Sequence, residues 1–314
     1  MIYANLMSVF LSNFLNVDIQ RFIHGNWNRP AFILSRFFLY VRYQIKREIL
    51  CIWAYFGRFI ILRFNVQPLI FDGSDIFIKS NNLEFLFLPE RNKGLFGIEF
   101  GKNWEEAELS LLEKHTKKEG TFFDIGAHIG WFTLNMCRSK NASVFAFEPS
   151  FELFEIAKKN VHRNGFEKKI VLEKLAIGNK NTSVRLSIDN FFGNYIENEF
   201  VSNRKTEEVQ MITLDSYIKK HQIKRVDSIK CDIEGSELFA LKGACESIKE
   251  FKPCILVEIQ KEWTRRFGYD PEEIFSFLYR YGYSYYRITE HGEIRQPGIN
   301  RSEELKEGHN FFFY

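Results

Sequence analysis

The sequence has no run of apolar residues long enough to form a transmembrane helix, which needs about 20 of them in succession. Its most apolar stretch, residues 32–64, is rich in Phe, Leu, Ile and Tyr but is repeatedly interrupted by Arg, Lys and Glu. The first 17 residues carry no charge, yet no basic segment precedes an apolar one, as a secretory signal requires. We therefore expect neither a membrane-spanning helix nor a signal peptide.

Closely spaced cysteines and concentrated positive charge are also missing. The five cysteines are scattered and form neither a CxxC pair nor a disulfide framework, which favours a reducing compartment and predicts no zinc site. The formal net charge is only +3 and the basic residues are dispersed, whereas nucleic-acid-binding proteins concentrate them on one face. We expect a cytoplasmic protein that does not bind nucleic acid.

The 314 residues suffice for one large α/β domain and a smaller N-terminal region. Residues 1–66 are aromatic and basic, with the pattern of amphipathic helices. Such helices pack against their own domain or, alternatively, lie peripherally on a membrane or against a partner. Residues 67–102 contain short apolar runs at 69–71, 76–78 and 83–88 separated by turn formers, which predicts a small β-meander.

Residues 103–314 are interpreted as the main domain. A helix is expected to begin at Asn103, with Glu105 and Glu106 in its first turn, and to end near Gly120. Beyond it, apolar strands alternate with helical segments, which predicts a doubly wound, mostly parallel α/β sheet whose ligands bind beyond the carboxyl ends of the strands. The expected strands are 121–124, 143–148, 170–177, 228–232, 254–259, 283–288 and 310–313, and the expected helices are 130–138, 151–164, 236–249 and 271–281.

An insertion of polar and aromatic residues interrupts this alternation at 189–205. It lies between two further strand-like runs, 183–188 and 208–213, and contains Phe191, Phe192, Asn194 and Tyr195. These side chains suit a sugar-like ligand or a closing lid, but a surface hairpin explains the pattern equally well.

The first strand of the main domain ends in a glycine-containing turn that is led by an acid. Gly126 and Gly130, with Ala127 and His128 between them, permit close approach of the backbone to a ligand, although an ordinary strand-to-helix turn has the same glycines. Asp124 stands where the dinucleotide fingerprint GxGxxG has its first glycine, so a nicotinamide-dependent oxidoreductase is disfavoured. An acid here suits a ligand with an ammonium group, such as S-adenosylmethionine (SAM).

The second strand ends in another acid, Glu148, which is followed by Pro149. Glu148 comes 24 residues after Asp124 at the neighbouring strand tip, where a carboxylate can accept hydrogen bonds from both ribose hydroxyls. Alternatively, Glu148 is an acid at the start of the next helix, where the helix dipole favours a negative charge. Leu175 and Ala176, at the third strand, are expected to contact the adenine.

Five motifs resemble those of FkbM-type methyltransferases. In chain order they are DIGAHIGWFT at 124–133, FEP at 147–149, LAIG at 175–178, TLD at 213–215 and IKCDIEGSELFALKGA at 229–244. The resemblance implies a SAM-dependent O-methyltransferase, in a family whose acceptors are often sugars, glycolipids or polyketide-like natural products. It also implies cofactor-binding roles for Asp124, Gly126 and Glu148. His128 and Ser236 depart from the Asn and His that the family more often has at these positions.

The fourth and fifth strands carry candidate catalytic residues at their ends. Lys230 and Asp232 share one face of a strand, and Glu234 follows its tip. We expect Asp232, which also borders the cofactor, or Glu234 to act as general base, and Lys230 to hold a carboxylate or to stabilise developing oxyanion charge. Glu258 would orient the acceptor.

Two alternatives to this interpretation stay open. The acids Asp232, Glu234, Glu237 and Glu258 could bind a divalent cation, although Glu237 also fits a structural helix-start acid and Lys230 could merely neutralise buried acids. The chain could also be a catalytically silent scaffold that binds a partner or membrane through residues 1–66. We predict a methyltransferase without a metal that acts on a small-molecule or glycan acceptor.

Overall fold

The computed structural model describes residues 69–72, 75–86, 105–188, 195–196, 205–289, 291–298, 301–307 and 309–314. The chain divides into two compact units, Met1–Pro68 with Leu88–Asn92, and Leu69–Phe87 with Lys93–Tyr314. All described residues belong to the second unit, so the helices predicted within 1–66 and the predicted helix start at Asn103 lie outside them.

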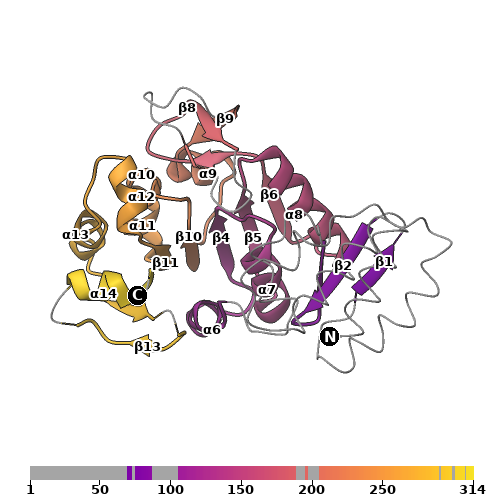
Figure 1. Ribbon diagram of the computed structural model, residues 1–314, viewed down its shortest axis with the longest axis horizontal. Helices are drawn as coiled ribbons and strands as arrows, with labels where there is room; N and C mark the ends of the chain where they lie inside the picture. Colours follow the sequence, from indigo (N-terminus) through magenta and orange to yellow (C-terminus); the bar gives the residue numbers. More distant parts are fainter. Residues whose placement is uncertain are drawn as a thin grey trace, which may run out of the picture. The chain divides into compact units, whose positions relative to one another are not determined.

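A central sheet of eight strands organises the described residues (Figure 1). Its spatial order is β13, β12, β14, β11, β10, β4, β5, β6, and the five strands from β11 to β6 are parallel. The other three extend the β11 edge by antiparallel pairing, and the predicted doubly wound, mostly parallel sheet is thereby confirmed. The bounds are β4 (Thr121–Ile125), β5 (Ser143–Phe147), β6 (Ile170–Glu173), β10 (Ser228–Cys231), β11 (Cys254–Glu258), β12 (Tyr285–Ile288), β13 (Ile294–Arg295) and β14 (Asn310–Phe313).

Helices cover both faces of this sheet. On one face lie α6 (Glu106–His115), α7 (Trp131–Lys140) and α8 (Phe151–Arg163), which contact the strands beneath them. The large buried cluster on the other face includes residues of α9 (Leu214–Lys220), α10 (Glu237–Lys242), α11 (Cys245–Phe251) and α13 (Glu272–Arg280). Two further helices are α12 (Lys261–Arg266) and α14 (Arg301–Glu307). Within the described residues, no helix is long and apolar enough to cross a membrane.

The predicted strand 170–177 is wrong as a single element. It divides into β6 and β7 (Ala176–Ile177), and β7 leaves the central sheet to pair with β9 (Thr206–Ile212). The polar Lys174 lies at the break, and the backbone groups of β7 find hydrogen-bond partners in the second sheet instead of beside β5. The antiparallel pairing of β8 (Thr182–Ser187) with β9 matches the hairpin predicted around the insertion.

The predicted helix 236–249 is also wrong as a single element, because α10 ends at Lys242 and α11 begins at Cys245. A Cβ at Gly243 would lie 1.9 Å from the Gly178 carbonyl oxygen, so the chain here touches the LAIG motif closely. Asp215, from the TLD motif, accepts hydrogen bonds from the backbone N–H groups of Glu246 and Ser247 and thereby caps a new helix start.

The first helix is shorter than predicted. α6 spans Glu106–His115, with Glu105 as its N-cap, and ends because Thr116 is extended, whereas the sequence predicted continuation to near Gly120. The side chain of Glu105 forms no cap hydrogen bond, and its backbone is left-handed (φ 50°). Its carboxylate is thereby left available for other contacts.

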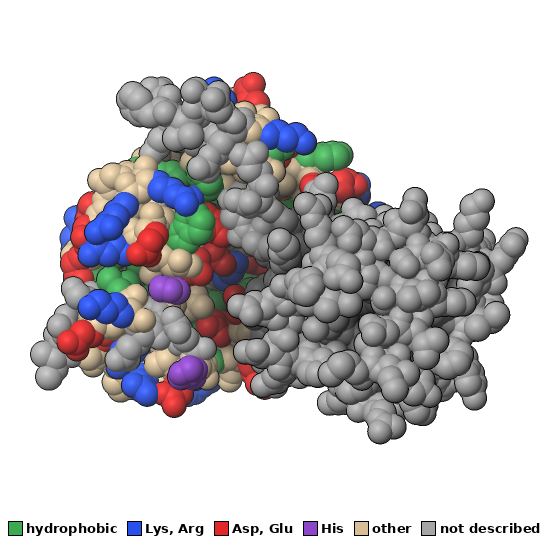
Figure 2. All heavy atoms as spheres, in the orientation of Figure 1, with side chains coloured by type: hydrophobic (Ala, Val, Ile, Leu, Met, Phe, Trp, Pro, Cys, Tyr) green, Lys and Arg blue, Asp and Glu red, His purple; other side chains and the backbone are tan. Residues whose placement is uncertain are grey.

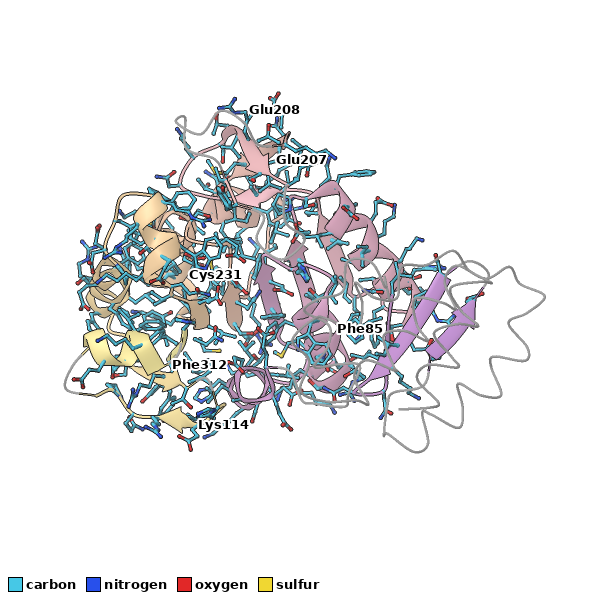
Figure 3. All side chains as sticks on the ribbon, viewed as in Figure 1. Phe85, Lys114, Glu207, Glu208, Cys231 and Phe312 are labelled. Atoms are coloured by element: carbon cyan, nitrogen blue, oxygen red, sulfur yellow. The ribbon has the colours of Figure 1, made fainter. Side chains whose placement is uncertain are left out.

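A three-stranded meander packs beside α7 and α8, as Figure 1 shows. It consists of β1 (Leu69–Asp72), β2 (Asp75–Ser80) and β3 (Leu83–Leu86) in antiparallel pairing, close to the predicted runs. Phe85, labelled in Figure 3, lies with its ring centre 5.3 Å from that of Trp131 in α7. The backbone N–H of Leu86 donates to Asn160 in α8 at 2.6 Å. The meander therefore supports the helices that follow the first two parallel strands.

Candidate active site

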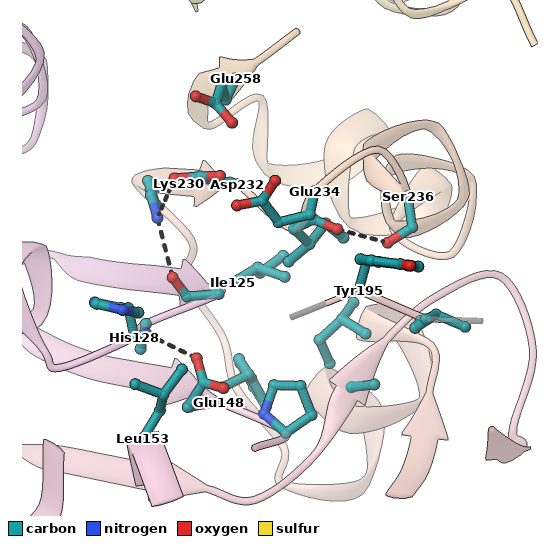
Figure 4. A pocket seen from close by; sticks show the side chains of 18 of the residues that line it. Ile125, His128, Glu148, Leu153, Tyr195, Lys230, Asp232, Glu234, Ser236 and Glu258 are labelled. Carbon is teal, nitrogen blue, oxygen red and sulfur yellow. Dashed lines mark hydrogen bonds and ion pairs between the residues drawn. The ribbon is translucent and has the colours of Figure 1, made fainter. Parts of the chain in front are cut away.

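A cavity of about 430 Å³ opens at the carboxyl ends of β4, β5, β10 and β11 (Figure 4). Its two sides differ, because His128 and Glu148 face the group formed by Lys230, Asp232, Glu234 and Glu258. Most of the predicted site residues line the cavity, namely Gly126, Ala127, His128, Glu148, Pro149, Leu175, Ala176, Lys230, Asp232, Glu234 and Glu258. Asp124 and Gly130 are not part of its lining.

Gly126 is required by its backbone and by its neighbours. Its φ is 82°, and a Cβ there would lie 1.9 Å from the carbonyl oxygen of Asp232 at the tip of β10. The N–H groups of Gly126 and Ala127 both donate to the Phe147 carbonyl at 3.0 Å. The turn is therefore fixed to both neighbouring strands, while Gly130, also left-handed, serves as the N-cap of α7.

Asp124 lies behind the cavity and is fully buried. Its Oδ2 accepts hydrogen bonds from the backbone N–H of Thr133 at 3.0 Å and from the Thr133 hydroxyl at 2.5 Å. Its Oδ1 has no hydrogen-bond partner within the described residues. Burial raises the pKa of Asp124, while Lys230 and the Thr133 hydrogen bonds oppose that rise. Through these hydrogen bonds, Asp124 holds the first turn of α7 against β4.

Glu148 is held by the backbone on both of its carboxylate oxygens. Oε2 accepts from the N–H of His128 at 2.8 Å, and Oε1 accepts from the N–H of Ser150 at 3.0 Å. His128 is itself left-handed (φ 53°), a conformation that Asn and His adopt more readily than most residues. Burial raises the pKa of Glu148 to about 7, and the two N–H groups counteract the rise. The carboxylate is thus presented in one orientation, with lone pairs left for a ligand.

Apolar side chains continue the wall next to Glu148. Leu153 of α8 lies near Glu148 in Figure 4, and Pro149, Leu175, Ala176 and Ile177 line the same cavity. Ala176 and Ile177 are buried in β7, the short strand that left the central sheet. This arrangement offers a flat aromatic ring both apolar contact and backbone polar groups.

Lys230 lies at the centre of the opposite side. Its Nζ donates to the Gly126 carbonyl at 3.0 Å and lies 3.1 Å from Oδ2 of Asp232. Burial alone would lower the pKa of Lys230, but the carboxylates of Asp232, Asp124 and Glu105 outweigh burial and raise it. Lys230 is therefore a permanent cation that links the tips of β4 and β10.

Asp232 and Glu258 share a single proton. Burial would raise the pKa of Asp232, but Lys230 and a hydrogen bond with Glu258 lower it. Burial and the negative charge of Asp232 raise the pKa of Glu258 well above its usual range, while the Gln260 amide, which donates to Glu258 at 2.9 Å, opposes this rise. The proton consequently resides on Glu258, and Asp232 is the charged partner of Lys230.

Glu234 faces the cavity from a strained turn. Its backbone is left-handed (φ 56°), and its Oε2 is buried without a hydrogen-bond partner in the described part of the chain. Burial and the charges of Asp232 and Glu237 raise the pKa of Glu234 to about 8. Glu234 is therefore a carboxyl group that changes its protonation state near neutral pH.

Glu237 supports this turn from beneath and does not line the cavity. Its Oε1 accepts hydrogen bonds from the N–H groups of Ile233 and Gly235, both at 3.0 Å. The Tyr269 hydroxyl donates to Oε2 at 3.4 Å. Among the described residues, no group of three or more His, Cys, Asp or Glu side chains could hold a metal ion.

Among the wall residues that were not predicted from the sequence as parts of this site are Glu105, Trp263 and Tyr195. Glu105 precedes α6, Trp263 lies in α12, and Tyr195 belongs to the insertion, where it had been noted only as a member of an undecided lid or hairpin. The guanidinium of Arg266 lies 3.9 Å from the Trp263 ring centre and 4.6 Å from that of Tyr195. The aromatic residue in the insertion was an available signal, but no pattern linked Glu105 or Trp263 to the strand tips.

A second cleft, of about 910 Å³, adjoins the first. The two share Ile177, Ile196 and Ser236, and the rings of Phe239 and Phe267 in its wall lie 6.1 Å apart. Its polar lining comprises Asn179, Lys180, Thr182, Ser183, Arg185, Glu208 and Ser236. On the molecular face in Figure 2, basic and acidic side chains are intermixed, without a continuous basic stripe among the described residues.

Several known proteins are similar to this chain. The chain is 23% identical over 174 residues to the hexuronic acid methyltransferase AglP of Haloferax volcanii, covering 55% of this chain and 67% of that relative. It is similar to the solved methyltransferase FkbM from Methylobacillus flagellatus (19% identity, TM-score 0.44), covering 63% of this chain but less than half, 44%, of that one. A putative methyltransferase from Streptococcus mutans, solved in complex with SAH, is 9% identical, with a TM-score of 0.40 and coverage of 66% and 94%.

The family itself is shown by a family model that matches more than half of the chain. The model described as the methyltransferase FkbM domain matches residues 124–285, which is more than half of the 314 residues. The matched range contains all five sequence motifs and all the predicted site residues. The resemblance predicted from the motifs is confirmed, and the chain belongs to the FkbM methyltransferase family.

Proposed function

We propose that this protein is a SAM-dependent O-methyltransferase whose acceptor is a hydroxyl group of a sugar or a sugar-like molecule. The observation that carries the proposal is the arrangement of Glu148, whose two oxygens are fixed by backbone N–H groups, opposite the ionisable group around Lys230. One side of the cavity suits a ribose and a purine, and the other offers a base for an acceptor.

The residues present fit the cofactor. Glu148 would accept hydrogen bonds from the ribose hydroxyls, and Leu175 and Ala176, with Pro149, would contact the adenine. The glycine turn at Gly126 would approach the ligand most closely, because no side chain projects there. Bound SAM supplies a methyl group on a sulfonium, so the protein has to align the acceptor oxygen and remove its proton.

Glu234 is the better of the two predicted general bases. Asp232 is held by Lys230 and Glu258, and its lowered pKa makes it a weak proton acceptor. Glu234 lines the cavity, has one oxygen without a hydrogen-bond partner among the described residues, and has a pKa raised to about 8, close to the pH at which a base works best. Lys230 would hold a carboxylate, the first of its two predicted roles, and Glu258, whose proton is directed to Asp232, would orient the acceptor by accepting a hydrogen bond.

A sugar-like acceptor is supported by the second cleft and by the named relative. Aromatic rings such as Phe239 and Phe267 stack on sugar faces, and the surrounding Asn, Thr and Ser side chains suit hydroxyl groups. The cleft meets the cavity at Ser236, so an acceptor could extend through it while one hydroxyl reaches Glu234. The relative AglP is named for methylation of a hexuronic acid.

The proposal is tested by incubating the purified protein with methyl-labelled SAM and a panel of glycans, glycolipids and hexuronic-acid oligosaccharides. Mass spectrometry of the labelled product should locate the methyl group on an oxygen. Transfer to nitrogen or carbon would contradict O-methylation, and a folded protein that binds neither SAM nor S-adenosylhomocysteine would contradict the function as a whole.

A further inference from the structure

The amino-acid tail of the proposed cofactor carries two opposite charges, and each needs a partner in the cavity. From the sequence, Asp124 was expected to bind the ammonium group. That carboxylate, however, is fully buried outside the cavity lining, and its Oδ2 already accepts two hydrogen bonds from Thr133. A different carboxylate has to be considered for the ammonium group.

Most of the carboxylates that do line the cavity are already engaged. Glu148 is bound by two backbone N–H groups at the opposite side, and Asp232 and Glu258 are bound to each other, to Lys230 and to Gln260. Glu234 lies on the turn that follows β10, next to Ser236 and the second cleft. The remaining carboxylate is that of Glu105.

Glu105 lines the same cavity as the glycine turn. Its carbonyl accepts the first helical hydrogen bond of α6, from Leu109 at 3.0 Å, but its carboxylate neither caps the helix nor accepts any other hydrogen bond within the described residues. Burial raises the pKa of Glu105 to about 8, Lys230 lowers it, and the charges of Asp232, Glu108 and Asp124 raise it further. Its backbone is left-handed, which is unfavourable for a residue with a side chain, and the residue lines the cavity.

Lys230 has capacity for the opposite charge. An ammonium group has three N–H donors, and two of them are used by the Gly126 carbonyl and by Asp232. We propose that Glu105 and Lys230 form a subsite for an amino-acid zwitterion, in which Glu105 accepts from the α-ammonium and Lys230 donates to the α-carboxylate. The inference rests on the proposed SAM-dependent function, and it adds a residue outside the family match at 124–285.

The test separates the amino-acid tail from the rest of the ligand. S-adenosylhomocysteine and 5′-methylthioadenosine both contain adenosine and a neutral sulfur, but only the first has the tail. By calorimetry, Glu105→Gln should weaken binding of S-adenosylhomocysteine about 10- to 100-fold and change binding of 5′-methylthioadenosine by less than about twofold. Glu106→Gln, one residue later and exposed, should change neither affinity.

Three results would overturn the subsite. Equal affinity of wild type and Glu105→Gln for S-adenosylhomocysteine, or equal weakening of both ligands, would show that Glu105 does not recognise the tail. If Glu105→Gln does not fold, the wild-type protein decides, since equal affinity for S-adenosylhomocysteine and its desamino analogue would exclude recognition of the ammonium. Wild-type protein that binds SAM but fails these tests leaves the proposed function intact, whereas absence of all binding removes both.

Discussion

Carboxylates at the tips of β4 and β5 are held by backbone and hydroxyl donors, whereas those at the tips of β10 and β11 are held by one another and by Lys230. Glu148 is fixed by two backbone N–H groups, and Asp124 by Thr133. Asp232, in contrast, depends on Lys230 and on a proton that it shares with Glu258. We call the first region the cofactor side and the second the acceptor side.

On the cofactor side the backbone fixes the geometry of the carboxylates, whereas on the acceptor side neighbouring charges fix their protonation. On the cofactor side, substitutions should act through the path of the backbone, because the donors are part of the chain itself. On the acceptor side they should act through charge and pH, because each group sets the ionisation of its neighbours. Such a division suits a reaction in which one ligand is always the same and the other has to lose a proton.

The largest effect is expected from Gly126→Ala, on the cofactor side. Its Cβ would lie 1.9 Å from the Asp232 carbonyl oxygen, so the substitution should destabilise the protein by at least about 4 kcal/mol in urea unfolding. The matched control is Gly165→Ala, which has a similar φ of 71° but no atom within 4 Å of the new Cβ, and should cost about 1 to 2 kcal/mol. Equal losses at the two sites would show that the contact between β4 and β10 is unimportant.

The next largest effect is expected from Glu234→Gln, on the acceptor side. Removal of the general base should lower kcat about 100-fold or more while the dissociation constant of S-adenosylhomocysteine changes by less than about threefold. Because the raised pKa of about 8 keeps Glu234 protonated at lower pH, wild-type kcat/KM should rise between pH 6.5 and pH 9. The variant should lack this rise, and a variant that retains it would transfer the role of base to another group.

The sequence predicted the cavity walls well because the motifs follow strand ends, and parallel strands bring their carboxyl ends together. Lys230, Asp232 and Glu148 lie where the alternation of strand residues indicated. The exclusion of Asp124 from the cavity could not be predicted, because its partner Thr133 lies nine residues later and the turn between them sets their geometry. The sequence predicted Glu105 as an ordinary acid in the first turn of a helix. In the structure it precedes the helix as its N-cap, with a left-handed backbone that the sequence does not indicate.

Two errors in the predicted fold have a common cause, which is contact between segments that are distant in the sequence. The apolar run of LAIG looks like the end of a strand, and GSELFALKGA looks like one helix. In the structure each of these two predicted elements forms two elements, because Gly178 contacts Gly243 closely and because Asp215 caps α11. Local periodicity does not record contacts of this kind, although the resemblance had already singled out these motifs.

A smaller effect is expected from Glu148→Gln, again on the cofactor side. One oxygen can still accept from the backbone, but the other becomes an amide N–H₂ group facing a backbone N–H donor. The affinity for S-adenosylhomocysteine should fall about tenfold, since a charge-assisted hydrogen bond to the ribose is lost. Glu152→Gln, exposed in the first turn of α8, is the control and should leave the affinity unchanged.

The smallest effect concerns the turn beneath the acceptor side. Burial raises the pKa of Glu237 to about 7, so the folded protein binds a proton there that the unfolded chain, with a pKa near 4.5, has released. The stabilisation from this proton is present at low pH and is lost as pH rises toward 7 and above, by about 1 kcal/mol between pH 6 and pH 8. In urea unfolding, the free energy of unfolding of Glu237→Gln should change between pH 6 and pH 8 by about 1 kcal/mol less than that of wild type. Glu250→Gln, which is exposed, should behave as wild type. An unchanged pH dependence in Glu237→Gln would mean that this carboxyl is ionised in the folded protein, and that backbone donors govern the acceptor side as they govern the cofactor side.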